Sequence, residues 1–215
     1  MSVFPALILR DVRHAYRSGG FGLPVVFFLL VATLYPFAVG PDGPLLARTG
    51  GGVLWVAALL AALLPIDRLI APDMEHGVLD QLAVRGVSDE GVAAAKLVAH
   101  WLGFGPPLMI AAIPAAALLR LSGDTLTRLE LGLLLGTPGL GALALMVAAL
   151  TAGLRGAGAL AGLLMLPLAV PLLIFGAGSL DPASGGAVKL LAACSMLAVA
   201  ICPFAAGAAL RAARD

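Results

Sequence analysis

Charged residues are scarce in this chain. Among its 215 residues only 12% are Asp, Glu, Lys or Arg, which is about half the usual share for a soluble domain, whereas 61% are hydrophobic. A soluble domain of this length has too small an interior to hide so much apolar surface. The composition therefore excludes an ordinary cytosolic enzyme and a disordered chain, and it leaves lipid as the solvent for most of these side chains.

An excess of one charge and a set of cysteines are also missing. Thirteen basic and 12 acidic residues leave a formal net charge of +1, so we expect no nucleic-acid partner. Two cysteines cannot form a disulfide scaffold. Cys194 and Cys202 lie two helical turns apart in one apolar stretch, which favours packing roles over a disulfide. We predict no metal site and no catalytic group.

Long apolar runs are what the chain has instead. Six runs are free of Asp, Glu, Lys and Arg: residues 18–41, 49–66, 97–119, 131–154, 156–180 and 190–210. A helix needs about 20 apolar residues to cross a bilayer, and these runs lack the alternation of barrel strands. We predict an all-α, polytopic membrane protein in which residues 1–215 form one domain with six transmembrane helices.

Basic residues are divided unevenly between the connections. An even number of spans places both termini on one side, and that side collects nine Lys and Arg residues against four on the other. Because basic residues concentrate on the cytoplasmic side, we expect both termini in the cytoplasm. In residues 1–17, apolar side chains recur at helical spacing between basic ones, which predicts a helix lying in the membrane interface.

The one substantial polar segment, residues 67–96, joins the second and third spans on the side of the termini. We expect Asp73 to cap a short amphipathic helix with Glu75 in its first turn, and Gly86 to end it. Ser88 is expected to start a second helix that leads into the third span. On amphipathicity alone, the first helix could equally be a solvated loop helix without a partner.

This segment resembles the cytoplasmic coupling segment of ABC-2-type permeases. The string Glu75-His-Gly-Val-Leu-Asp-Gln-Leu, followed by Ser88 and Lys96, is similar to their Glu-x-Gly-Thr-Leu-Glu-x-Leu pattern and the lysine that enters the third span. Val78 stands where Thr is usual and Gly86 where Pro is frequent, and both departures suit a helix-turn-helix.

Seven further strings narrow the resemblance. They are LYPFAVGP at 34–41, LLAR at 45–48, VLWVAALL at 53–60, KLVAHW at 96–101, LGTPGLG at 135–141, LPLAVPLLIF at 166–175 and PFAAGAALR at 203–211. Together, and over nearly the whole chain, they resemble the CcmB family, the haem exporter permease of cytochrome c maturation.

The resemblance implies a bacterial cytoplasmic (inner) membrane protein that works with other chains. These are an ABC ATPase subunit, a second copy of this chain, a haem-handling membrane partner and a periplasmic haem chaperone. ATP would be bound by the ATPase, since Gly50-Gly51-Gly52 is followed by Val53 and has no lysine for a phosphate-binding loop. Haem is expected as cargo and not as a bound cofactor. The residues expected to couple to the ATPase are Asp73, Met74, Glu75, Gly77, Val78, Leu79, Asp80, Leu82 and Arg85.

Three functions stay open at this point. The chain could export haem, or it could be an ABC-2-type permease for a drug, a lipid or a polysaccharide. Alternatively, it could use ATP to release the haem-loaded chaperone without carrying haem itself. Candidate haem or pathway residues are His100, Trp101, Glu130, Pro138, Pro167 and Pro171. His100 is the histidine deepest inside a span and could ligate iron, although it could equally reach the cytoplasmic interface. The prolines could kink pathway helices or simply pack.

Overall fold

The computed structural model describes residues 3–17, 20, 22–154 and 157–214, and its regular elements are all helical. Six helices are long and apolar enough to cross a membrane, as predicted. They are α2 (Gly22–Val39), α3 (Gly43–Leu63), α6 (Asp89–Leu118), α7 (Gly123–Thr151), α8 (Ala157–Gly178) and α9 (Ala187–Ala212). The shorter elements are α1 (Val3–Arg17), the 3-10 helix η1 (Ile66–Arg68), α4 (Ala71–Glu75) and α5 (Val78–Val84).

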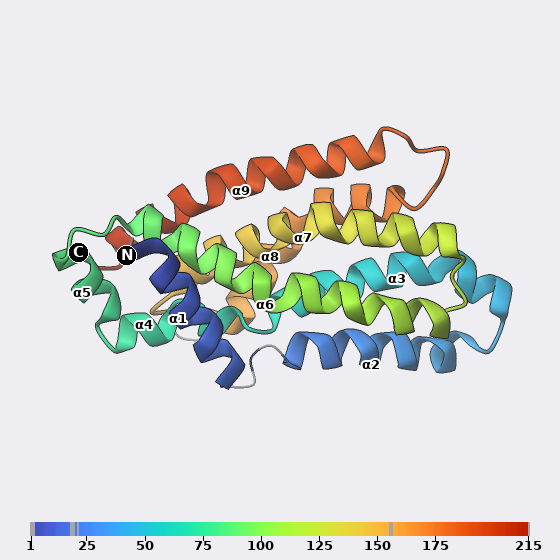
Figure 1. Cartoon of the computed structure of the whole chain (residues 1–215), viewed down its shortest axis with the longest axis horizontal. Coiled ribbons are helices and arrows are strands. Elements are labelled where there is room, and N and C mark those ends of the chain that lie inside the picture. Colours follow the sequence, from blue (N-terminus) through green and yellow to red (C-terminus); the bar gives the residue numbers. More distant parts are fainter. Residues whose placement is uncertain (1–2, 18–19, 21, 155–156, 215) are drawn as a thin grey trace.

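The six long helices run along the longest axis of the molecule (Figure 1). The α2–α3, α6–α7 and α8–α9 connections lie at one end, which we call the hairpin end. Both termini, α4 and α5 lie at the other end, which we call the terminal end, and there α1 crosses α6 obliquely. This arrangement groups the polar segment of the sequence with the two termini.

Helix α7 is the central helix, packed on α6, α8 and α9. Its glycines permit this close packing: a Cβ added at Gly136 would lie 2.6 Å from the Trp55 ring, and one at Gly139 would lie 2.8 Å from the Ser195 Cα. The buried Ser195 hydroxyl accepts a hydrogen bond from the Gly139 N–H at 2.9 Å. In α7 the small residues therefore serve helix packing.

The helices extend beyond the charge-free runs that predicted them. Helix α3 begins at Gly43, since Asp42 caps it by accepting from the Leu45 N–H, and it therefore includes Arg48. Helix α7 begins at Gly123 under a Ser122 cap, so Glu130 lies in its third turn and does not open the span. The predicted spans stopped at the first charged residue, but charged residues such as Arg48 and Glu130 lie inside the ends of the helices. The first residues of the predicted spans 18–41 and 156–180 lie outside the described residues, as does Arg155 in the connection between the fourth and fifth spans.

The polar segment departs from its prediction at one point. The single amphipathic helix expected from Asp73 onward is two short helices, α4 and α5, separated by Gly77 in the left-handed conformation with φ of 65°. Asp73 is not a cap, because it lies inside α4 and its carboxylate is bonded to side chains of other helices. The second half of the prediction is confirmed: α5 ends before Gly86, and the Ser88 hydroxyl caps α6.

Helix α6 is continuous from the polar segment through the span. It contains 30 residues, and Pro106, Pro107 and Pro114 lie inside it. Helix α1 is present as predicted, with Leu7 buried and Phe4 and Leu9 exposed. Its position in a membrane interface stays a prediction.

Candidate functional site

The α4–α5 segment presents two different faces. Leu79 is buried in the hydrophobic core and anchors α5 from within. Val84, at the end of α5, is 90% exposed, and Glu75, Asp80 and Arg85 are exposed on the same segment. Met74, Gly77, Val78 and Leu82 are half-buried. The segment therefore has one side anchored in the core and another side on which Val84 and charged residues are exposed.

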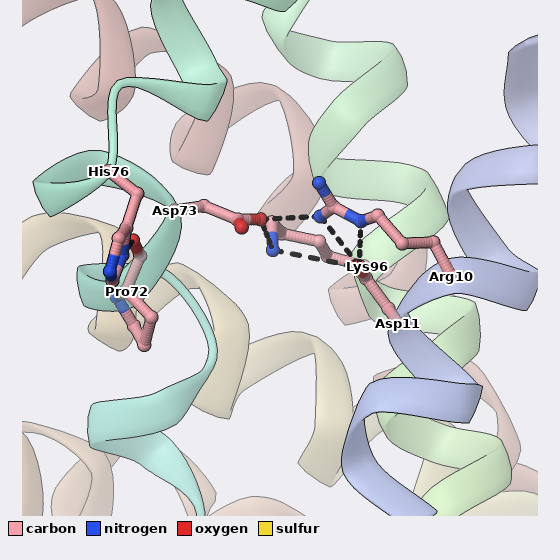
Figure 2. Close-up of polar contacts among 6 residues, drawn as sticks. All are labelled: Arg10, Asp11, Pro72, Asp73, His76 and Lys96. Atoms are coloured by element: carbon pink, nitrogen blue, oxygen red, sulfur yellow. Dashed lines mark hydrogen bonds and ion pairs between the residues drawn. The ribbon is translucent and has the colours of Figure 1, made fainter. Parts of the chain in front are cut away.

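Four charged side chains join three helices beneath this segment (Figure 2). We call Arg10, Asp11, Asp73 and Lys96 the charge cluster. The Asp73 carboxylate from α4 lies 2.5 Å from Lys96 Nζ of α6 and 2.5 Å from Arg10 Nη2 of α1. The Asp11 carboxylate lies 2.6 Å from the same Arg10 nitrogen and 3.4 Å from Lys96 Nζ. Each carboxylate thus bridges both cations, and α1, α4 and α6 are joined.

The charge cluster is electrically balanced and largely out of water. The Lys96 side chain is only 7% exposed, and burying a lysine is costly unless carboxylates neutralise it. Burial lowers the pKa of Arg10, but Asp11 and Asp73 outweigh it and hold that pKa above its ordinary value. His76 takes no part, since its ring turns back to the Pro72 carbonyl oxygen, 2.6 Å from Nδ1 (Figure 2).

A second set of ion pairs ties the C-terminal helix to the same segment. Arg211 pairs with Glu90, and Arg214 pairs with Asp89, both at the first turn of α6. Arg214 also donates to the carbonyl oxygen of Leu79 at 3.4 Å. The end of α9 and the residues after it are therefore bonded to both α5 and α6, so that α1, α6 and the C-terminal end all connect to the α4–α5 segment.

A cavity of about 720 Å³ lies beside the charge cluster, between α1, the start of α2, α4 and α6. Its lining includes all four residues of the charge cluster and all three histidines of the chain, His14, His76 and His100. His100 is buried, its ring lies 4.8 Å from that of Phe104, and its Nε2 atom has no hydrogen-bond partner among the described residues.

The other predicted pathway residues do not gather around this cavity. Trp101, next to His100, donates through Nε1 to the Thr137 hydroxyl at 3.0 Å and so joins α6 to α7. Pro138 is half-buried in α7, whereas Pro167 and Pro171 are exposed on α8. Glu130 lies in the third turn of α7, which begins at the hairpin end, and is half-buried; its buried Oε1 atom has no hydrogen-bond partner in the part of the chain that the structure describes. The structure brings together His100 and the coupling segment, and leaves these five residues apart.

The charge cluster was not predicted from the sequence. Its most distant members, Arg10 and Lys96, are 86 residues apart in the sequence, and no local pattern links α1 to α6. One signal was available: Lys96 stands among apolar residues at the start of a span, so a carboxylate from elsewhere in the chain had to accompany it.

Comparison with known proteins gives a match over this whole architecture. The family model described as CcmB protein matches residues 2–213. The chain belongs to the CcmB family. Among its relatives is "Heme exporter protein B" of Paracoccus denitrificans, 49% identical over 212 residues that cover 96% of this chain and 97% of the relative. The proteins of the same name from Haemophilus influenzae and Escherichia coli K12 are 43% and 42% identical. They cover 99% and 97% of this chain, and 99% and 98% of their own lengths. Family membership thus extends over both the six long helices and the α4–α5 segment.

Proposed function

We propose that this chain is the membrane permease subunit of an ABC haem exporter that serves cytochrome c maturation. The observation that supports this most directly is the full-length similarity to relatives named heme exporter protein B. The six candidate membrane spans fit a permease. ATP hydrolysis is assigned to a separate ATPase chain, and the α4–α5 segment to its docking site. A second copy of this chain, a haem-handling membrane partner and a periplasmic haem chaperone complete the proposed assembly.

The terminal end is placed in the cytoplasm. Among the described residues, that end holds eight Lys and Arg residues: Arg10, Arg13, Arg17, Arg68, Arg85, Lys96, Arg211 and Arg214. The hairpin end holds four, namely Arg48, Arg120, Arg128 and Lys189. This asymmetry supports a cytoplasmic terminal end, with α1 at the membrane interface.

Motion of the α4–α5 segment would reach three other helices through bonds already described. Asp73 joins the segment to α1 and α6, and Leu79 joins it to α9 through Arg214. Closure of the ATPase would therefore displace α1, α6 and α9 as a group, which is a rigid-body switch. The same motion serves either output: movement of haem outward, or release of the haem-loaded chaperone.

The assignment is tested by purifying the tagged chain together with its ATPase and membrane partners. We expect Val84→Asp to abolish ATPase co-purification, because it places a charge on the exposed apolar end of α5. Ala183→Asp adds the same charge in the α8–α9 connection at the hairpin end and should leave ATPase binding unchanged. Haem spectra of the complex before and after ATP report which chain holds haem.

Equal ATPase binding by the two variants would contradict the docking assignment. A haem signal on this chain that shifts with ATP supports transport by this subunit. Haem that stays on the membrane partner, with ATP-dependent chaperone release, supports mechanical coupling. Normal holo-cytochrome c in cells that lack this chain would contradict both. Labelling of Val84→Cys and Ala183→Cys with a membrane-impermeant thiol reagent tests orientation, since intact cells should expose only the second.

A further inference from the structure

The cavity beside the charge cluster is lined from the α4–α5 segment by Pro72, Asp73, His76 and Val78, and Val84 is not among its described lining residues. Its volume of about 720 Å³ falls within the range of small-molecule sites, about 300–1,000 Å³. Its lining includes residues of α1, α4 and α6, the three helices that the charge cluster joins. A preformed hollow of this size at the terminal end has the dimensions of a ligand site.

The inner part of the cavity is apolar. Ala99, Gly103 and Phe104 line it from α6, and Pro24 and Leu69 line it from the start of α2 and from the segment before α4. Phe104 is fully buried and stacks near the His100 ring. This part would accept a flat or branched hydrocarbon body.

The outer part of the cavity has a cationic excess. Arg10, Lys96, Asp11 and Asp73 line it but neutralise one another in pairs. Arg68 also lines it, is exposed, and has no carboxylate within ion-pair distance among the residues that the structure describes. His14 and His76 also line the cavity. An exposed guanidinium without a counter-charge at the mouth of an apolar hollow favours a carboxylate or phosphate ligand.

We propose that this cavity binds an amphiphilic anion, with its acidic group at Arg68 and its apolar body against Ala99 and Phe104. Two sources share this chemistry: a porphyrin dicarboxylate such as haem, and an anionic phospholipid. The proposal of an anion-binding site depends only on the geometry of the cavity, whereas the identification of haem as the anion rests on the proposed function. If haem is the ligand, His100 is the lining side chain that offers an imidazole to the iron.

Both sources are tested on the complex with its ATPase, reconstituted in phosphatidylcholine nanodiscs. One arm titrates haem and, as a probe without carboxylates, protoporphyrin IX dimethyl ester. The other arm adds phosphatidylglycerol and counts retained lipid by native mass spectrometry. Arg68→Gln removes the unpaired cation, and Arg13→Gln removes an exposed arginine of α1 outside the cavity as the matched control. Ala99→Phe fills the apolar part.

We expect Arg68→Gln to weaken binding of the anionic probe about threefold or more, as for loss of one partly exposed charge contact, and Arg13→Gln to leave it unchanged. Ala99→Phe should abolish binding while the complex stays intact. If Ala99→Phe fails to assemble, two comparisons still test the proposal: Arg68→Gln against Arg13→Gln, and haem against the diester probe. Preference for haem over the diester, lost with Arg68→Gln, identifies the haem source. Retained phosphatidylglycerol, lost with the same variant, identifies the lipid source.

The proposal is overturned if neither anion binds, or if Arg68→Gln and Arg13→Gln behave alike, or if an intact Ala99→Phe complex still binds. Such a result with normal ATP-dependent haem output would leave the proposed function standing. Conversely, Arg68-dependent phosphatidylglycerol binding without any haem-linked output would refute the proposed function and keep the site.

Discussion

Replacing Asp73 should lower the free energy of unfolding, because it leaves the cations of the charge cluster without one of their two carboxylates. In Asp73→Asn, Lys96 keeps only Asp11, 3.4 Å away and shared with Arg10, so two buried or half-buried cations face one carboxylate. Loss of one partner from a buried ion pair costs about 3–5 kcal/mol. Because Asp11 remains and Arg10 is partly exposed, we expect the free energy of unfolding to fall by about 3 kcal/mol.

Lys96→Met reverses the imbalance, since two carboxylates then face Arg10 alone, and a similar loss of about 3 kcal/mol is expected. The double variant Asp73→Asn/Lys96→Met leaves the neutral pair of Arg10 and Asp11. We therefore expect it to lose no more than about 3 kcal/mol, and not the sum of about 6 kcal/mol.

The measurement is unfolding by SDS in mixed micelles, followed by the fluorescence of Trp55 and Trp101. Asp80→Asn, an exposed carboxylate of α5 outside the charge cluster, serves as the control and should change stability by less than about 0.5 kcal/mol. If the two single losses simply add in the double variant, the side chains are not energetically coupled and the bridge between α4 and α6 is refuted.

Three further predictions concern backbone and packing. Gly77→Ala should cost about 1 kcal/mol, measured in the same micelles, because its φ of 65° is unfavourable for a residue with Cβ. Gly136→Ala should prevent stable assembly, seen as loss of a monodisperse peak in size-exclusion chromatography, since the new methyl would lie 2.6 Å from the Trp55 ring. Gly162→Ala should elute normally, because an added Cβ would meet no described atom within 4 Å outside the neighbouring backbone of its own helix, and the reverse order of the two variants would contradict the packing. Ser88→Ala should cost about 1 kcal/mol through loss of the α6 cap, and no loss would show that the cap is dispensable.

The membrane architecture followed from sequence because lipid imposes simple rules. A run without charge and of sufficient length must be helical and must span, so all six long helices were predictable. The starts of α3 and α7 were not, since Asp42 and Ser122 extend these helices past the first charged residue by capping, whereas the Ser88 cap of α6 was predicted. A hydrophobicity criterion cannot detect a helix that continues into water.

The site was predictable only in part for a different reason. The α4–α5 segment was found through its polarity and its motif, but not its break at Gly77, because glycine is compatible with a helix and with a left-handed turn. The charge cluster and the cavity depend on where α1 lies against α6, which is a tertiary contact between segments 85 residues apart. Periodicity within one segment carries no information about that contact.

The length of α6 and the position of its prolines determine how far the terminal end moves when α6 bends. Pro106 and Pro107 remove two successive backbone donors just past the midpoint of the 30-residue helix. The part from Asp89 to that point is an arm about 25 Å long, and a tilt of about 10° at the prolines would sweep its tip by about 4 Å. Lys96 lies about 15 Å from Pro106 along this arm, so the same tilt would move the charge cluster by about 2.6 Å, about half a helical turn. Conversely, a displacement of α4 by a few ångströms requires only a small bend of α6 at the prolines.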